Sequence, residues 1–220
     1  MISAIETTAR KGNAPIYQLK VILLDSDPPV WRRIQVPGDA RLDWLHAALQ
    51  VGIGWTNSHL HQFRVGERCF SDTRHHFAEF EGDPEILEER KFTLRQIAPR
   101  GQDVFGYEYD FGDSWEHEIT VDKILSPDAA AAKTVRCLDG ARACPPEDCG
   151  GVWGYKDLLK ILKNRKHPEH KTMEEWLGRA FDAEAFDVGK TNLRLRKLKW
   201  PNVTEAQLRK ILMSRDDYHE

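Results

Sequence analysis

Residues 107–121 read Tyr-Glu-Tyr-Asp-Phe-Gly-Asp-Ser-Trp-Glu-His-Glu-Ile-Thr-Val, and this stretch decides the fold. Large side chains occupy every second position on both sides of a central Asp-Phe-Gly-Asp, and a period of two is typical of half-buried strands. Gly112 permits the tight turn between the two runs. The stretch therefore predicts an antiparallel hairpin over residues 106–125.

Four further segments before this hairpin have a regular pattern. Residues 16–23 and 30–36 read as two strands, separated by an Asp-Ser-Asp-Pro-Pro turn. Residues 42–53 place apolar side chains three and four positions apart, which predicts a helix. Residues 58–70 alternate again and predict one more strand, whereas residues 71–91 have no period and predict an insertion or long loop.

The resulting order, β-β-α-β-β-β, predicts an α+β fold. We expect a roll resembling the ubiquitin-like β-grasp over about residues 14–125. A cysteine loop and a C-terminal helical extension are expected over about 135–200, with a helix at Tyr155–Leu162. Capping-box sequences predict two further helix starts, at Thr172 and Thr204. Residues 1–14 are expected to form a flexible arm, and 201–220 a C-terminal helix or tail.

Composition limits the class of protein. The chain has 220 residues, of which 40% are hydrophobic, and a net charge of −3. Its apolar runs are shorter than the ~18 residues that predict a membrane span, and the first fifteen residues lack the apolar core of a secretory signal. We therefore expect a cytoplasmic protein that does not contact membranes, with reduced thiols.

Basic residues are concentrated near the C-terminus. Residues 156–220 contain 15 Lys and Arg against 11 Asp and Glu. This pattern indicates either a solvated polar face or a patch that contacts nucleic acid or an acidic protein partner. The excess is densest at Arg194, Arg196, Lys197 and Lys199.

Three histidines lie in alternating segments. His59 and His61 are expected on one strand face, which is a valid metal-ligand spacing, and His117 follows Trp115 on the next hairpin strand. These faces are otherwise apolar, so the alternative is a set of core histidines that are held by hydrogen bonds. If the two strands pair, the three rings are expected to meet, and a carboxylate, a thiolate or a metal ion would be their partner.

Two pairs of carboxylates allow a structural and a functional interpretation. Asp110 and Asp113 either shape the hairpin turn or orient a histidine. Glu147 and Asp148 lie in a Pro-Pro-Glu-Asp-Cys-Gly-Gly stretch before a helix, and they either satisfy that loop or serve as site carboxylates. With residues 144–155 as its lid, the predicted pocket is lined by His59, His61, Asp110, Asp113, Trp115, His117, Glu147, Asp148 and Tyr155.

Three cysteines lie close together, at Cys137, Cys144 and Cys149. With six and four residues between them they do not form the Cys-x-x-Cys pair of a zinc knuckle. Three interpretations remain open: a structural zinc site that is completed by a distant histidine, buried thiols that pack a loop, or a redox pair. Zinc is therefore the possible cofactor.

Several segments, taken in order, carry a family resemblance. They are Ile16–Val21, Pro29–Arg33, Leu45-His46, Gly54-Trp55, His59–Phe63, Tyr109–His117 and Cys144–Tyr155. Together they resemble the plasmid-Ri open-reading-frame-three-like family, a transposable-element passenger protein of the "TnpR" type, over residues 14–200. The resemblance implies an α+β roll-like fold of unknown biochemical function, found on plasmids, transposons and chromosomes. It carries over no catalytic residue, and its motif does not require Cys149.

Three functional hypotheses follow. The preferred one is a cytoplasmic binding or interaction module associated with plasmids or mobile elements. The second is a metal-dependent hydrolase or nuclease, in which His and Asp side chains hold the ion that activates water. The third is an interaction protein that pairs an exposed sheet edge with a partner strand.

Overall fold

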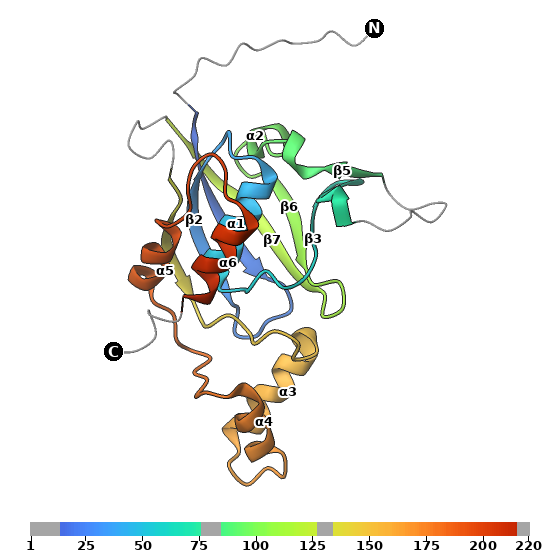
Figure 1. The fold of residues 1–220 in the computed structure, drawn as a ribbon, viewed down its shortest axis with the longest axis vertical. Helices are drawn as coiled ribbons and strands as arrows, with labels where there is room; N and C mark the ends of the chain where they lie inside the picture. The colour runs from blue at the N-terminus through green and yellow to red at the C-terminus, as the bar shows by residue number, and fades with distance from the viewer. Residues whose placement is uncertain (1–13, 76–84, 127–133, 215–220) are drawn as a thin grey trace, which may run out of the picture.

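The computed structural model describes residues 14–75, 85–126 and 134–214. These residues form one eight-stranded sheet in the order β5-β4-β3-β6-β7-β1-β2-β8 (Figure 1). Neighbouring strands are antiparallel, except that β4 and β5 are parallel. The strands are β1 (Ile16–Leu23), β2 (Trp31–Pro37), β3 (His61–Val65), β4 (Arg68–Ser71), β5 (Ile86–Glu88), β6 (Val104–Tyr109), β7 (Trp115–Leu125) and β8 (Arg136–Ala141).

Helices cover one face of this sheet and extend from one end of it. Figure 1 shows α1 and α6 in front of the strands, while α3 and α4 project below them. Helix α5 contacts β8 and α1. The helices are α1 (Leu42–Ile53), α2 (Leu94–Ile97), α3 (Gly151–Lys163), α4 (His170–Leu177), α5 (Val188–Leu195) and α6 (Glu205–Met213), with 3₁₀ turns η1 (Thr73–His75) and η2 (Glu89–Lys91).

The core lies between the sheet and α1. The alternation along β1 is confirmed, because Tyr17, Leu19 and Val21 are buried while the residues between them are partly exposed. Helix α1 is buried along almost its whole length. Trp55, which follows α1, packs against Trp115 of β7 with 5.0 Å between ring centroids.

The α+β class is confirmed, but the sheet is larger than the predicted roll. Residues 58–70 form two strands rather than one, since the chain turns at Gly66, whose φ is +59°. Strand β5 lies within the predicted loop 71–91, and β8 within the cysteine stretch. Strands this short show too few alternations for a period to be read from the sequence.

Two of the predicted helix starts were wrong and one is confirmed. The Thr204 capping box is present at α6. Helix α4 begins at His170, which places Thr172 inside it, and α3 begins at Gly151 rather than Tyr155. The predicted arm falls almost wholly on residues 1–13, outside the described residues. The predicted C-terminal helix or tail at 201–220 contains α6, and only its residues 215–220 lie outside the described residues. The predicted domain boundaries stay predictions.

A buried arginine joins α1 to β8. Arg32 is 2% exposed, and its side chain donates to the backbone carbonyls of Trp31, Gly52, Ile53, Ala141 and Arg142 at 2.8–3.1 Å. A guanidinium has five N–H donors, so these five bonds match its full capacity. Gly52 and Ile53 are at the C-terminus of α1, where the helix dipole favours a cation.

None of the helices in the described ranges is both long and apolar enough to cross a membrane.

Candidate functional site

His59 lies in an irregular segment between α1 and β3. Gly54, whose φ is +119°, is the C-cap of α1, and Asn57 also has a positive φ of +58°. The backbone N–H groups of Ser58 and His59 donate to the hydroxyl of Tyr109, at 2.9 and 3.3 Å. His59 therefore precedes the strand in which it was expected, and the period-two argument does not apply to it.

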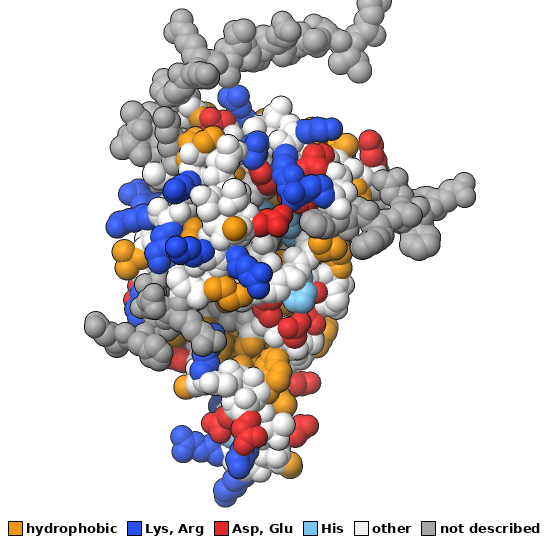
Figure 2. All heavy atoms as spheres, in the orientation of Figure 1, with side chains coloured by type: hydrophobic (Ala, Val, Ile, Leu, Met, Phe, Trp, Pro, Cys, Tyr) orange, Lys and Arg blue, Asp and Glu red, His pale blue; other side chains and the backbone are white. Residues whose placement is uncertain are grey.

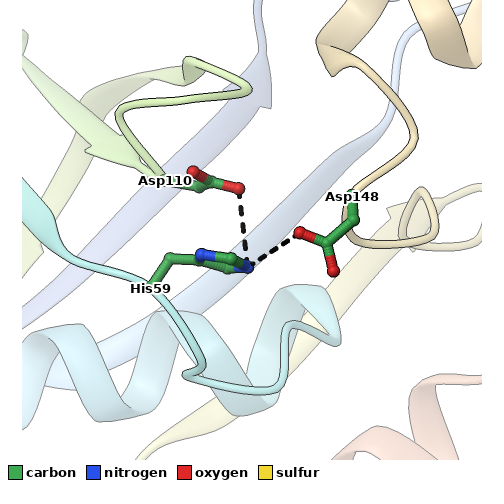
Figure 3. A group of neighbouring side chains, drawn as sticks. All are labelled: His59, Asp110 and Asp148. Atoms are coloured by element: carbon green, nitrogen blue, oxygen red, sulfur yellow. Dashed lines mark ion pairs between the residues drawn. The ribbon is translucent and has the colours of Figure 1, made fainter.

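Three carboxylates surround the imidazole of His59. Its Nε2 atom lies 3.6 Å from Oδ2 of Asp110, 3.4 Å from Oε2 of Glu147 and 3.3 Å from Oδ1 of Asp148. Figure 3 shows Asp110 and Asp148 approaching this nitrogen from the hairpin turn and from the loop before α3. In Figure 2, histidine and carboxylate side chains gather on the face in view, above the α3–α4 arm. We call His59, Asp110, Glu147 and Asp148 the His59 cluster.

In two of these carboxylates, the oxygen that does not face His59 accepts hydrogen bonds from neighbouring residues. Oδ1 of Asp110 accepts from the backbone N–H of Gly112 at 3.0 Å. Oε1 of Glu147 accepts from the N–H and hydroxyl of Thr56, at 2.5 and 2.7 Å. Each of these residues thus presents its remaining oxygen toward His59, with the carboxylate already oriented.

The Nε2 atom of His59 is the focus of the cluster. It is inaccessible to solvent and makes no hydrogen bond within the described residues, although the side chain as a whole is 29% exposed. Ligand atoms of His59, Asp110 and Asp148 all lie within 4.8 Å of one another, the geometry of a group able to hold a metal ion. A buried ring nitrogen normally has a partner, so this arrangement requires an explanation.

The two loops that carry Asp110 and Asp148 are fastened together. Oδ2 of Asp113 accepts from the N–H of Gly150, the N-cap of α3, at 3.2 Å. A Cβ atom at Gly151 would lie only 2.4 Å from the carbonyl oxygen of Asp113, so only glycine permits this approach. Asp113 is therefore a residue that positions the cluster rather than a member of it.

A second histidine group is buried beside the cluster. The rings of His46 and His61 stack with centroids 3.4 Å apart, and His61 Nε2 lies 2.8 Å from Oε2 of Glu89. His46 contacts the hydroxyl of Tyr107 at 2.9 Å and Oδ1 of Asn57 at 2.6 Å. We call His46, His61, Glu89 and Tyr107 the buried histidine network.

Burial controls protonation in this interior. It lowers the pKa of His46 to about 3, with the neighbouring His61 as the next cause. Burial likewise raises the pKa of Glu89 to about 7 and lowers that of His117 to about 4. His46 and His117 are therefore neutral at pH 7.

The meeting of three histidines was predicted for the case that their strands pair, but β6 lies between β3 and β7 in the sheet, and the three rings do not meet. His61 and His117 both pack against Tyr107, with centroids 6.0 and 5.4 Å from it, whereas His59 faces the carboxylates. His117 has its own contact, since Nδ1 lies 3.2 Å from the carbonyl oxygen of Tyr107. The alternative of core histidines therefore describes His61 and His117.

Two aromatic residues of the predicted pocket are structural. Trp115 is fully buried in the core. Tyr155 of α3 is 3% exposed and packs edge-on to Phe181, 6.2 Å between centroids. Neither ring lines the His59 cluster in the described contacts.

The cysteines do not form a metal site with one another in the described part of the chain. Cys137 lies in β8, its N–H donating to Asn192, while Cys144 packs beside Gly54 and Cys149 lies next to the start of α3. Burial raises the pKa of all three thiols. The described metal-ligand group contains histidine and carboxylates instead.

The predicted basic patch is interrupted. Arg194 is 8% exposed, because α5 packs against β8 and α1 there. Arg196, Lys197 and Lys199 are exposed. A patch that includes Arg194 was therefore wrong, while contact of the other three with an acidic partner stays a prediction.

Sequence reasoning missed His46 and Glu89. His46 lies on the same face of the predicted helix as Leu42 and Leu49, and Glu89 lies in the aperiodic stretch before β6. A polar residue inside a helix that proves to be almost wholly buried is a signal that could have indicated His46.

Comparison with known proteins now identifies the relatives. The family described as "plasmid pRiA4b ORF-3-like protein" matches residues 15–190. The chain belongs to this family. It is 36% identical over 190 residues to the "uncharacterized protein y4hQ" of Sinorhizobium fredii, covering 85% of this chain and 95% of that protein.

A solved structure from the same comparison has a similar fold. It is the crystal structure of MM3350, a protein of unknown function from Methanosarcina mazei Go1. The two share 33% identity and a TM-score of 0.67, covering 80% of this chain and 97% of the other. The MM3350 structure thus has a similar fold, and the names of both relatives assign no biochemical activity.

Proposed function

We propose that this plasmid pRiA4b ORF-3-like protein is a binding module whose ligand is a divalent transition-metal ion, held by His59, Asp110 and Asp148. The observation that carries the proposal is the buried Nε2 atom of His59, which has no hydrogen-bond partner within the described residues and faces carboxylate oxygens. One imidazole and two carboxylates are donors that zinc accepts.

The spacing of the donor atoms supports this ligand. In a tetrahedral site with zinc bonds of about 2.0–2.2 Å, neighbouring ligand atoms lie roughly 3.3–3.6 Å apart. The distances from His59 Nε2 to Asp148 and Asp110 are 3.3 and 3.6 Å, too long for strong hydrogen bonds. Asp148, with its side chain 73% exposed, can adjust toward an ion.

Glu147 supports the cluster from a second layer. Its carboxylate also contacts the hydroxyl of Tyr109 at 3.2 Å, and that hydroxyl accepts from the backbone of the segment that carries His59. Such outer contacts orient metal ligands in proteins. We therefore expect Glu147 to position His59 rather than to supply the main bond.

Direct metal titration tests the proposal. Purified protein, stripped of metal with chelator, is titrated with Co²⁺ and Zn²⁺, and we expect one ion per chain with the visible absorption of a four-coordinate cobalt site. His59→Ala and Asp110→Asn are expected to weaken binding by at least tenfold. His117→Gln is the matched control, since that histidine lies outside the cluster. Absence of stoichiometric binding to the wild type would contradict the proposal and leave the cluster as a set of ion pairs.

The other functional predictions remain proposals. Location in the cytoplasm, association with transposable elements and pairing of a sheet edge with a partner strand are untested. The relatives' names lend no support to the hydrolase or nuclease alternative, which needs a bound metal as its first condition.

A further inference from the structure

An apolar groove lies beside the His59 cluster. It is between α3 and α4, has a volume of about 230 Å³, and shares Asp148 with the cluster. Helix α3 contributes Leu158 and Ile161, and α4 contributes Met173 and Trp176. The indole of Trp176 is 47% exposed. The groove is therefore an apolar wall next to the proposed metal position.

The proposed metal centre has room for another ligand. His59, Asp110 and Asp148 supply three donor atoms, and three protein ligands with one open position are typical of zinc sites that bind exogenous molecules. Asp110 and Asp148 offset the charge of a divalent ion, and Glu147 adds a further negative charge beside it. A neutral or at most singly charged oxygen donor is therefore the head group that suits the remaining position.

The lining of the groove defines the rest of the ligand. Apart from Asp148, its charged member is Asp157, whose carboxylate is paired with Lys160 at 2.7 Å. Among the described residues no Lys or Arg lines it, so an anionic head has no protein cation to bind there. An apolar cavity of about 150 Å³ accommodates benzene, so 230 Å³ accommodates a single ring with a short linker.

From this juxtaposition, and resting on the proposed function, we propose that the protein binds a small organic ligand. An oxygen-donor head of this ligand coordinates the metal at the His59 cluster, and a single-ring apolar group fills the α3–α4 groove. Asp148 lies at the junction of the two parts.

Two hydroxamates with the same head test this assignment. Zinc-loaded full-length protein is titrated with benzohydroxamate and with acetohydroxamate by calorimetry. We expect benzohydroxamate to bind about tenfold more tightly, because its ring is removed from water in the groove. Both probes chelate zinc through the same hydroxamate group. If the probes removed zinc from the protein, they would therefore do so to a similar extent, and the difference between their affinities would not arise from this removal.

Variants locate the ring. Trp176→Ala is expected to reduce the tenfold preference to about threefold or less, with unchanged zinc affinity. Trp153→Ala is the matched control, because Trp153 is an exposed tryptophan of α3 that does not line the groove, and it should retain the preference. Should Trp176→Ala fail to fold, nuclear Overhauser contacts between the ring of benzohydroxamate and the methyl group of Met173 in the wild type replace it.

The outcomes separate the two proposals. Zinc binding with equal affinity for both hydroxamates, or a preference that Trp176→Ala leaves intact, overturns the groove ligand and leaves the metal site standing. Failure of zinc to bind in the preceding titration overturns both.

Discussion

His59 and His61 are separated by one residue, yet their surroundings differ in almost every respect. His61 lies in the buried histidine network, where its ring stacks on His46 and its Nε2 atom contacts Glu89. The hydroxyl of Tyr107 contacts His46 in turn. His59 faces three carboxylates with a buried nitrogen that lacks a hydrogen bond among the described residues. A buried polar group whose hydrogen bonds are satisfied stabilises a fold. A buried nitrogen that lacks a hydrogen bond and lies next to carboxylate oxygens is instead available to bind a ligand.

The largest effect is expected from a substitution in the buried histidine network. His61→Ala should lower the free energy of unfolding by about 3–5 kcal/mol, because it leaves a cavity and removes the partner of buried Glu89. Urea unfolding at pH 7 without metal measures this. His59→Ala should cost no more than about 1 kcal/mol in the same experiment. Equal losses for the two variants would remove the distinction between the regions.

Addition of zinc tests the His59 cluster. At a free zinc concentration 100 times the dissociation constant, the wild type should gain about 2.7 kcal/mol in free energy of unfolding. His59→Ala should gain none, while His61→Ala, if it folds, should keep the gain. Thermal or urea unfolding with and without zinc measures the difference, and a gain retained by His59→Ala would place the ion elsewhere.

A pH series sharpens the comparison further. The folded-state pKa of Glu89, about 7, exceeds its ordinary value of 4.5, so the folded protein binds more protons between these values. The contribution of Glu89 to stability is therefore present below about pH 4.5 and is lost as the pH rises through 7. Relative to Glu89→Gln, the wild type should lose about 1–3 kcal/mol between pH 5 and pH 8.

His46 contributes a slope of the opposite sign. Its folded-state pKa is about 3, so its stabilisation is present above pH 6.5 and is lost as the pH falls. This slope occurs in both proteins and largely cancels when wild type and Glu89→Gln are compared. A difference between them that does not change with pH would show that Glu89 does not titrate in this range.

The smallest effect tests whether the two regions communicate. Asn57 joins them, since its side chain contacts His46 and its segment carries His59. Asn57→Gly keeps a residue that tolerates the positive φ but removes the contact, which should cost about 1 kcal/mol. If the contact positions His59, zinc affinity should also fall by roughly two- to fivefold, an effect measured by competition with a chromogenic chelator. Unchanged affinity would make the regions independent.

Much of this architecture was predictable because its long elements have complete periods. The 107–121 hairpin and the helix at 42–53 each show several repeats of their pattern. The edge strands β5 and β8 were missed because three to six residues in mixed sequence show too little of it.

The candidate site was only partly predictable. His59, Asp110, Glu147 and Asp148 were each identified by residue type and context, but so were residues that prove structural, such as Trp115 and Tyr155. His59 and His61 differ because β3 begins at His61. His61 is therefore turned into the core, whereas His59 precedes the strand and faces the carboxylates. The end of a strand is set by tertiary contacts rather than by local sequence pattern, so this difference could not be predicted.

The buried side chain of Arg32 helps to determine where Asp148 lies. Arg32 donates a hydrogen bond to the carbonyl of Arg142, and Asp113 accepts one from the N–H of Gly150. The segment between Arg142 and Gly150, which carries Asp148, is therefore a short tether held at both ends. Pro145 and Pro146 remove further freedom from it. A short, doubly pinned tether keeps the effective concentration of its groups high near a fixed point. The backbone of Asp148 is therefore held close to His59, while its exposed side chain keeps the freedom to adjust toward an ion.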